Sequence, residues 1–295
     1  MTQPFIQLTP HLWAVQSRLY DTNSSMFISQ GQAVLIDPGV YPDEIEAIAR
    51  FTAERDATPQ AIIITHGHWD HILGPEHLPG VQIVAQANYL HETDGEYGAA
   101  TLRQIAAWET QSGIEREQPF AIPRPDVTFD QTTTLTVGDL SLRLVHAPGH
   151  TSDQLVVYHP GSAALIAGDM LSDAEIPTII HNLAAHRRTM AMLAGWDIRR
   201  LIPGHGKATT DPIKIRTRIS ADVAYLAELH GKVEQAVRQG KTVAETVELC
   251  AEMGFSCPEE NARAHLLNVE SAYIELGGEA NPRKVGWGQF LNDAN

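Results

Sequence analysis

Residues 61–64 form a short run of apolar, mostly β-branched side chains that ends directly in a cluster of histidines and a carboxylate. Such a run is typical of a strand that is covered on both faces, as in parallel sheets. A second apolar run at 34–36 precedes it, and a helix that begins near residue 43 lies between the two. Strand, helix and strand in this order favour parallel pairing through a crossover connection, so we expect an α/β fold.

The cluster at 65–71 reads Thr-His-Gly-His-Trp-Asp-His and follows the strand where α/β folds usually bind ligands. In an extended loop alternate residues point the same way, so His66 and His68 can bind one ion. A turn into a short helix then lets the adjacent Asp70 and His71 face a second ion. Histidine occurs 14 times in 295 residues, which makes chance assembly of this spacing rare. The spacing therefore indicates a metal site.

Three more candidate ligands each come one to four residues after a predicted strand. The strands are 140–146, 163–167 and 199–202, and the residues that follow them are His150, Asp169 and His205. Glycines beside these residues permit tight backbone turns. Seven nitrogen and oxygen ligands suffice for two ions if one carboxylate is shared. Histidine and carboxylate donors without a thiolate suit zinc, iron or manganese.

The other elements expected in the first 210 residues also alternate between strands and helices. Strands are predicted at 81–85, 127–136 and 155–158, helices at 98–112 and 182–194, and a hairpin turn at 138–139. After residue 211 the apolar spacing of three, four and seven is helical, and three helices are expected there, ending at Gly240, Gly254 and residues 277–278. We therefore divide the chain into a catalytic unit, 1–210, and a helical subdomain, 211–295.

Over roughly residues 10–210 the sequence resembles the metallo-β-lactamase superfamily, in the binuclear hydrolase branch that includes glyoxalase II. The resemblance rests on the His-x-His-x-Asp-His motif and on the three later ligands. It implies an αββα sandwich of two similar halves with the metals along one edge. It assigns His66, His68 and His150 to one ion, Asp70, His71 and His205 to the other, and Asp169 to both. It also implies that Asp37 supports the ligands from behind without touching metal.

The function that this resemblance implies is metal-dependent hydrolysis. A hydroxide that bridges two divalent ions would attack the carbonyl of a small ester, thioester or lactone. Zinc is the expected ion, with iron or manganese as alternatives. Asp70 is a candidate to pass a proton toward the leaving group.

Other functions remain open at this point. One is a phosphodiesterase or ribonuclease of the same superfamily. The net charge of −15 disfavours a nucleic-acid partner and an anionic membrane surface. The 36 positions from Asp169 to His205 leave no room for the inserted domain of the RNA-processing branch. A persulfide dioxygenase with a single iron is another alternative, which the metal count would separate, and a metal-binding protein without activity is a third.

The sequence says less about the substrate, which we expect to be a small molecule. The segment after Asp169 has no Lys or Arg before Pro177, and Asp153 stands where the glyoxalase II pattern has glycine, so a glutathione thioester is disfavoured. The helical tail is expected to cover part of the cleft or to form a homodimer contact, and residues 91–125 are a second candidate rim. Three further histidines are candidates to line the pocket: His146, His181 and His186.

We expect a cytoplasmic protein. The first 30 residues contain no basic segment followed by an apolar one, as a secretory signal would require. No run of 18 or more apolar residues occurs that could span a bilayer.

Overall fold

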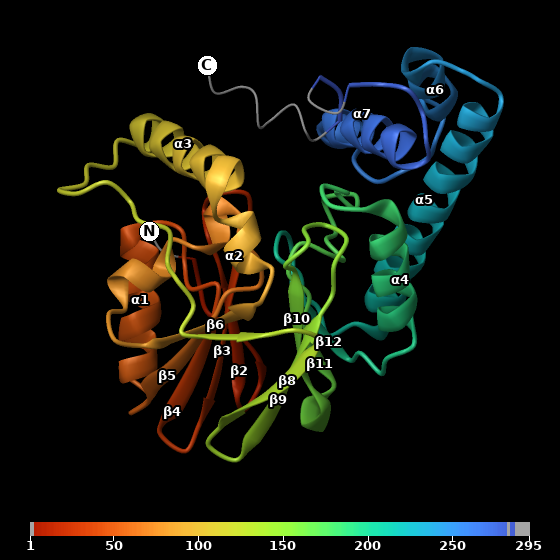
Figure 1. Cartoon of the computed structure of the whole chain (residues 1–295). Helices are drawn as coiled ribbons and strands as arrows, with labels where there is room; N and C mark the ends of the chain where they lie inside the picture. The colour runs from red at the N-terminus through yellow and green to blue at the C-terminus, as the bar shows by residue number, and fades with distance from the viewer. Residues whose placement is uncertain (1–2, 282–283, 287–295) are drawn as a thin grey trace.

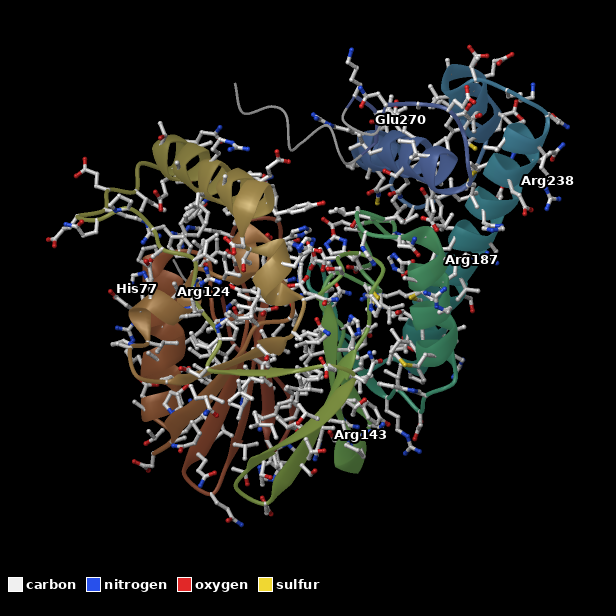
Figure 2. All side chains as sticks on the ribbon, in the orientation of Figure 1. His77, Arg124, Arg143, Arg187, Arg238 and Glu270 are labelled. Atoms are coloured by element: carbon white, nitrogen blue, oxygen red, sulfur yellow. The ribbon has the colours of Figure 1, made fainter. Side chains whose placement is uncertain are left out.

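The computed structural model describes residues 3–281 and 284–286. Two sheets lie face to face, and helices cover both outer sides (Figure 1). Side chains from both sheets fill the space between them (Figure 2). This αββα sandwich with helices at its C-terminal end confirms the predicted fold class. Residues 282–283 and 287–295 of the predicted helical subdomain, 211–295, lie outside the described residues.

The first sheet has seven strands in the order β1 to β7. Their bounds are Ile6–Thr9, Leu12–Gln16, Asn23–Ser29, Gln32–Ile36, Thr58–Ile63, Gln82–Gln86 and Val127–Phe129. Strands β1 to β4 pair antiparallel, and β4 to β7 pair parallel. Helix α1 (Pro42–Ala53) joins β4 to β5, so the predicted parallel crossover is confirmed.

The second sheet has five strands in the order β12-β11-β10-β9-β8. From β8 to β12 the bounds are Thr132–Val137, Leu140–His146, Leu155–His159, Ala164–Ile166 and Arg200–Ile202. Along β9 every second side chain is buried at first, because one face of this strand packs against the first sheet. Helix α4 (Leu183–Ala194) joins β11 to the parallel β12.

The remaining helices lie outside the two sheets. They are α2 (Tyr89–Glu92), α3 (Gly95–Ser112), α5 (Pro212–Arg238), α6 (Val243–Cys250) and α7 (Pro258–Glu275). Helix α5 runs along α4, and both contribute to one apolar core that also includes Val269 of α7 (Figure 1). Within the described residues, no helix combines the length and the apolarity that a membrane crossing requires.

No element is predicted before residue 34, but three strands form there. Strand β3 is buried along its whole length, although Asn23, Ser24 and Ser25 are polar. Asn23 Nδ2 donates to the carbonyl oxygens of Pro203 and Gly206, 2.9 and 2.8 Å away. These distant partners satisfy a polar side chain that the local pattern marks as exposed.

The predicted strand 127–136 is wrong, because the chain changes sheets within it. Strand β7 pairs with β6, whereas β8 pairs with β9. The carbonyl oxygen of Asp130 accepts a hydrogen bond from Gln86 in the first sheet. The carbonyl oxygen of Gln131 accepts one from the backbone of His146 in the second sheet. The backbone thus bonds to one sheet and, one residue later, to the other.

Candidate metal centre

The two sheets bring the predicted ligands to one edge of the sandwich. Strand β5 ends at Ile63, and the chain then turns through a short 3-10 helix at Trp69–His71. The second sheet supplies the others, since His150 follows β9, Asp169 follows β11 and His205 follows β12. All seven predicted ligands therefore lie in two adjoining groups.

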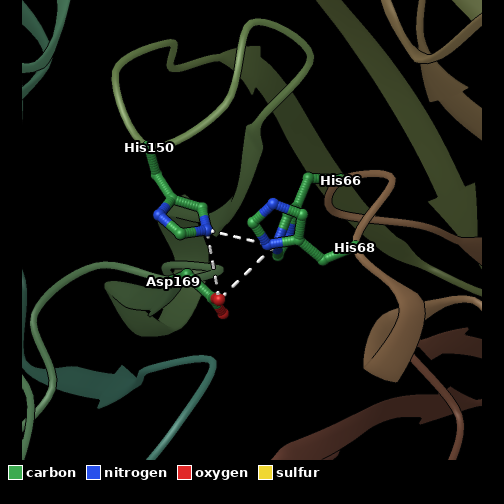
Figure 3. Close-up of side chains that lie close together, drawn as sticks. All are labelled: His66, His68, His150 and Asp169. Atoms are coloured by element: carbon green, nitrogen blue, oxygen red, sulfur yellow. Dashed lines mark hydrogen bonds and ion pairs between the residues drawn. The ribbon is translucent and has the colours of Figure 1, made fainter. Parts of the chain in front are cut away.

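The first ligand group contains His66, His68, His150 and Asp169, whose candidate donor atoms lie within 4.8 Å of one another (Figure 3). His150 Nε2 lies 3.1 Å from His68 Nδ1 and 3.3 Å from Asp169 Oδ2. His66 Nε2 lies 3.5 Å from the same oxygen of Asp169. Three nitrogens and one oxygen thus converge on one point, as ligands of a divalent ion do.

The second ligand group contains Asp70, His71 and His205, with donor atoms again within 4.8 Å of one another. His205 Nε2 lies 3.4 Å from His71 Nε2 and 3.4 Å from Asp70 Oδ2. Asp169 also reaches this group: its Oδ1 lies 3.1 Å from His71 Nε2, and its Oδ2 lies 3.3 Å from His205 Nε2. One carboxylate therefore contacts histidines of both groups.

The atoms of these groups fit metal ions. His66 Nε2 and Asp169 Oδ1 are buried, and neither makes a hydrogen bond. Burial lowers the pKa of His66 to about 4, so its ring is neutral and keeps a lone pair for an ion. A Cβ atom at Gly204 would lie 2.0 Å from Asp169 Oδ1, so a glycine is needed there to leave room for the carboxylate.

Contacts outside the two groups fix the orientation of three rings. His71 Nδ1 donates to Asp37 Oδ2 at 2.9 Å, and Asp37 also accepts from Thr65 N and Oγ1. Asp37 thus lies behind a ligand, where the sequence analysis expects it. His150 Nδ1 lies 3.1 Å from the carbonyl oxygen of Thr178, and His205 Nδ1 lies 3.1 Å from that of Tyr20. With the proton on Nδ1, each Nε2 presents its lone pair to the ligand group.

The contacts of Thr178 and Tyr20 with these rings are not predicted from the sequence. Tyr20 acts through its backbone carbonyl, which every residue has, so its residue type carries no signal. Thr178 acts through its carbonyl oxygen and its hydroxyl, and one threonine is too common in a sequence to be singled out. Tyr20 also has a φ of 53°, a left-handed conformation that is uncommon for residues other than glycine. A local pattern in the sequence does not predict it.

A cavity of about 520 Å³ opens beside both ligand groups. One wall comes from Glu92 and α3, and the other from the loop after Asp169. Its lining residues are Tyr20, Gly67, His68, Trp69, Asp70, Glu92, Tyr97, Ala100, Thr101, Gln104, His150, Thr151, Glu175, Thr178, Ile180 and His205. No Lys or Arg lines it within the described part of the chain.

The residues that line the cavity distinguish the two rims expected from the sequence, the helical tail and residues 91–125. Residues from 91–125 line it, through Glu92 and α3, whereas no described residue of α5, α6 or α7 does. The tail therefore does not cover the cleft with any residue that the structure describes. His146, His181 and His186 do not line the cavity either, and His186 is fully buried in α4.

Comparison with known families gives a match over most of the chain. A family model described as the metallo-beta-lactamase superfamily matches residues 18–205, the part that contains all seven candidate ligands. An uncharacterized protein of Aquifex aeolicus is 29% identical over 141 residues, which cover 48% of this chain and 60% of that protein. A protein of Gallus gallus named acyl-coenzyme A thioesterase MBLAC2 is 22% identical over 210 residues, covering 65% of this chain and 76% of the relative.

A solved structure matches nearly the whole chain. The stereoselective inverting sec-alkylsulfatase Pisa1 from Pseudomonas sp. superposes with a TM-score of 0.70 at 17% identity. The match covers 96% of this chain and 53% of that one, so it includes most of the helical tail. At this identity the likeness shows the fold alone. This chain spans about three fifths of the Aquifex protein and about half of the alkylsulfatase.

Proposed function

This chain belongs to the metallo-β-lactamase superfamily, and from that premise we propose that it is a two-metal hydrolase that cleaves a small ester, thioester or lactone at the carbonyl carbon. The observation that carries the proposal is the position of Asp169, whose carboxylate contacts histidines of both ligand groups. A carboxylate that reaches two groups is suited to bridge two ions. We propose zinc, for which histidine and carboxylate are common ligands, with iron or manganese as alternatives.

The residues would divide between the ions as the family resemblance implies. His66, His68 and His150 would hold one ion, Asp70, His71 and His205 the other, and Asp169 both. Two divalent ions bound there supply a water of lowered pKa and a Lewis acid for the substrate carbonyl. The contacts of Asp37, Thr178 and Tyr20 keep three rings in the tautomer that presents Nε2.

We propose that Asp70 also moves a proton toward the leaving group. Its side chain is 8% exposed, and it lines the cavity in which a substrate would bind. Its Oδ2 accepts a hydrogen bond from Thr22 Oγ1 at 3.4 Å, and this holds the carboxylate at the boundary between ligands and cavity. A carboxylate at this boundary can exchange a proton with a group among the ligands or with a substrate in the cavity.

The cavity lining supports a substrate with little negative charge. Its volume suits a small molecule, and Trp69, Tyr97 and Ile180 offer apolar surface. Glu92 and Glu175 would repel an anion, and no described Lys or Arg in the lining offsets them. We therefore propose hydrolysis at a carbonyl carbon, as in glyoxalase II, of a substrate that contains no glutathione.

An alkyl sulfate is the second candidate, because a linear primary-alkylsulfatase of Pseudomonas sp. is 23% identical over 249 residues, which cover 73% of this chain and 47% of that protein. A sulfate monoester is an anion, however, and would meet the same two glutamates. The carbonyl substrate is therefore favoured, and the two classes can be compared directly.

Elemental analysis and a substrate panel test the proposal. Protein purified without chelators is assayed for metal and then given an aryl ester, an acyl thioester, a lactone, an alkyl sulfate and a phosphodiester. We expect about two equivalents of metal, and a higher kcat/KM for a carbonyl substrate than for the sulfate or the phosphodiester. One equivalent of iron with oxygen-dependent turnover of a persulfide would instead identify a dioxygenase. Bound metal without turnover of any of these substrates would favour the alternative of a metal-binding protein without activity.

A further inference from the structure

The segment that joins β11 to α4 holds the ligand His150 from two sides. The backbone N–H groups of Ile180 and His181 donate to the carbonyl oxygen of His150 at 3.1 and 2.9 Å. On the ring, Nδ1 lies 3.1 Å from the carbonyl oxygen and 2.6 Å from Oγ1 of Thr178. The position of this segment therefore decides where the imidazole of His150 lies.

Residues 172–182 of the segment form neither helix nor strand, so they depend on contacts from elsewhere. Helix α7 provides these contacts through three residues spaced seven apart on one face: Asn261, Asn268 and Glu275. Residues seven apart lie above one another after two helical turns. The three side chains thus form a stripe, which we call the α7 stripe, beside the segment.

Asn268 makes the central contact of the α7 stripe. Its Oδ1 accepts from the backbone N–H of Ile179 at 2.9 Å, and its Nδ2 donates to the carbonyl oxygen of Pro177 at 2.7 Å. These two residues flank Thr178, which holds His150. The side chain of Asn268 is fully buried, so each of these hydrogen bonds forms away from water and is costly to lose.

The two ends of the stripe hold the neighbouring backbone. Asn261 Nδ2 donates to the carbonyl oxygen of Ala174 at 2.8 Å, and its Oδ1 accepts from Ile176 N at 3.3 Å. Glu275 accepts from the backbone N–H groups of Leu183 and Ala184, at 2.6 and 3.0 Å. These N–H groups belong to the first turn of α4, where a carboxylate is stabilising.

We propose that the α7 stripe is a positioning device for His150, and so for the ion of the first ligand group. This inference rests on the proposed metal centre. The second ligand group has other support, because His71 is held by Asp37 and His205 by the carbonyl oxygen of Tyr20. A change in the stripe therefore weakens metal binding at the first group and leaves the second group unchanged.

The test is Asn268→Ala in the full-length chain, with stepwise zinc titration and the visible spectrum of the cobalt-substituted protein. Loss of a residue that orients a ligand typically costs 10–100-fold in metal affinity. We expect a loss of about tenfold or more at one ion, a change of less than about twofold at the other, and an altered cobalt band. Thr178→Val should have a similar effect. The double variant should lose less free energy of metal binding than the sum of the two single losses, because both residues act on His150 through the same contacts.

Tyr273→Phe is the matched control on the same helix. It removes one hydrogen bond, from Tyr273 Oη to the carbonyl oxygen of Lys241, that lies within the tail. If both variants lower stability equally and neither changes the affinities or the cobalt band, the positioning role is wrong while the proposed function stands. If the unmodified protein binds no metal, the proposed function itself fails. Should Asn268→Ala not fold, the half-exposed Glu275 allows Glu275→Ala, where an unchanged affinity ratio would contradict the proposal.

Discussion

Asp70 and Asp169 are the two carboxylates of the candidate ligand groups, and their surroundings differ. Asp169 contacts four histidines, and these lower its pKa well below the usual range although burial alone would raise it. Its carboxylate therefore stays ionised between the two ligand groups. Asp70 contacts two histidines and also borders the cavity. Of these two carboxylates, Asp70 is the one that lines the cavity, which is the basis of the proton-transfer role proposed for it.

Asn in place of Asp70 keeps the size of the side chain and removes its charge. We expect kcat to fall by about 100-fold or more, as is typical when a proton-transfer group is lost. Metal analysis of the same sample separates this effect from metal loss, because the fall in kcat should persist in protein that holds two equivalents. Glu92→Gln is the control, since it removes a carboxylate charge from the cavity without touching either ligand group. Full metal with undiminished turnover in Asp70→Asn would exclude the proton-transfer role.

The buried carboxyl group of Asp222, in α5, predicts that the stability of the fold depends on pH. Burial raises the pKa of its carboxyl group to about 8, against the smaller opposing effects of the Leu171 backbone and Arg218. In the folded chain the group is therefore neutral at pH 6, whereas in the unfolded chain it is ionised. Unfolding releases this proton, so the stability that Asp222 contributes falls as the pH rises from about 4 to about 8.

Asp222→Asn cannot ionise and should remove this part of the pH dependence. The difference in free energy of unfolding, variant minus wild type, should rise steadily between pH 5 and pH 8 in urea titrations and then level off. Glu234→Gln, an exposed change of charge on the same helix, should give a difference that is nearly flat with pH. A flat difference for Asp222→Asn as well would mean that this carboxyl group is ionised in the folded chain throughout.

That the seven candidate ligands cluster could be predicted from sequence, because each is a histidine or an aspartate a few residues after a strand. The residues that orient them could not. Tyr20 acts through a carbonyl oxygen, and Thr178 acts through a carbonyl oxygen and a hydroxyl. The stripe on α7 begins 83 positions after Thr178, at Asn261. Their function depends on which segments the fold brings together, and one sequence contains no local sign of that.

At the scale of elements, α3 is the wall of the cavity that can be changed with least effect on the metal centre. Ala100 lines the cavity, while its neighbour Ala99 is exposed and does not. Ala100→Phe should fill part of the cavity and lower kcat/KM about tenfold for an ester with a bulky acyl group, since pocket contacts discriminate by factors of this size. An acetyl ester should be affected less than about twofold.

Ala99→Phe is the matched control, because it adds the same side chain to the same helix outside the cavity. Steady-state kinetics on both esters, with metal content measured alongside, give the comparison. Equal losses for the large and the small ester, or equal losses in both variants, would show that α3 does not select the substrate by size.

The elements themselves were predictable to different degrees. Strands β4 and β5 and helix α1 follow from local pattern, because their apolar spacing and their order both indicate a parallel crossover. Strands β1 to β3 do not, since β1 is partly exposed and β3 buries polar side chains that have distant partners. The division of 127–136 into β7 and β8 depends on which sheet offers the next hydrogen bond, and this is a tertiary property.

At the scale of the molecule, the candidate metal centre lies where the two sheets meet. The segment that follows β5 of the first sheet contributes four of the candidate ligands, and the second sheet contributes His150, Asp169 and His205. Hydrogen bonds from Asn23 of β3 to the carbonyl oxygens of Pro203 and Gly206 connect the same edge. An ion that binds ligands of both halves therefore stabilises the folded sandwich over the unfolded chain.

Removal of metal should consequently lower the unfolding temperature of the whole sandwich. A ligand present at 1,000 times its Kd stabilises the folded state by about 4 kcal/mol, which for a chain of this size is on the order of 10 °C. Differential scanning calorimetry with and without a chelator measures the shift, and the midpoint should rise with the logarithm of added zinc. The same chelator saturated with zinc beforehand is the control, because it should leave the midpoint unchanged. Hydrogen exchange should rise most in residues 64–71 and 203–206 when metal is removed, since these segments carry ligands from the two sheets. If chelation moves neither the midpoint nor the exchange of these segments, the two halves are held together by their apolar core without help from an ion.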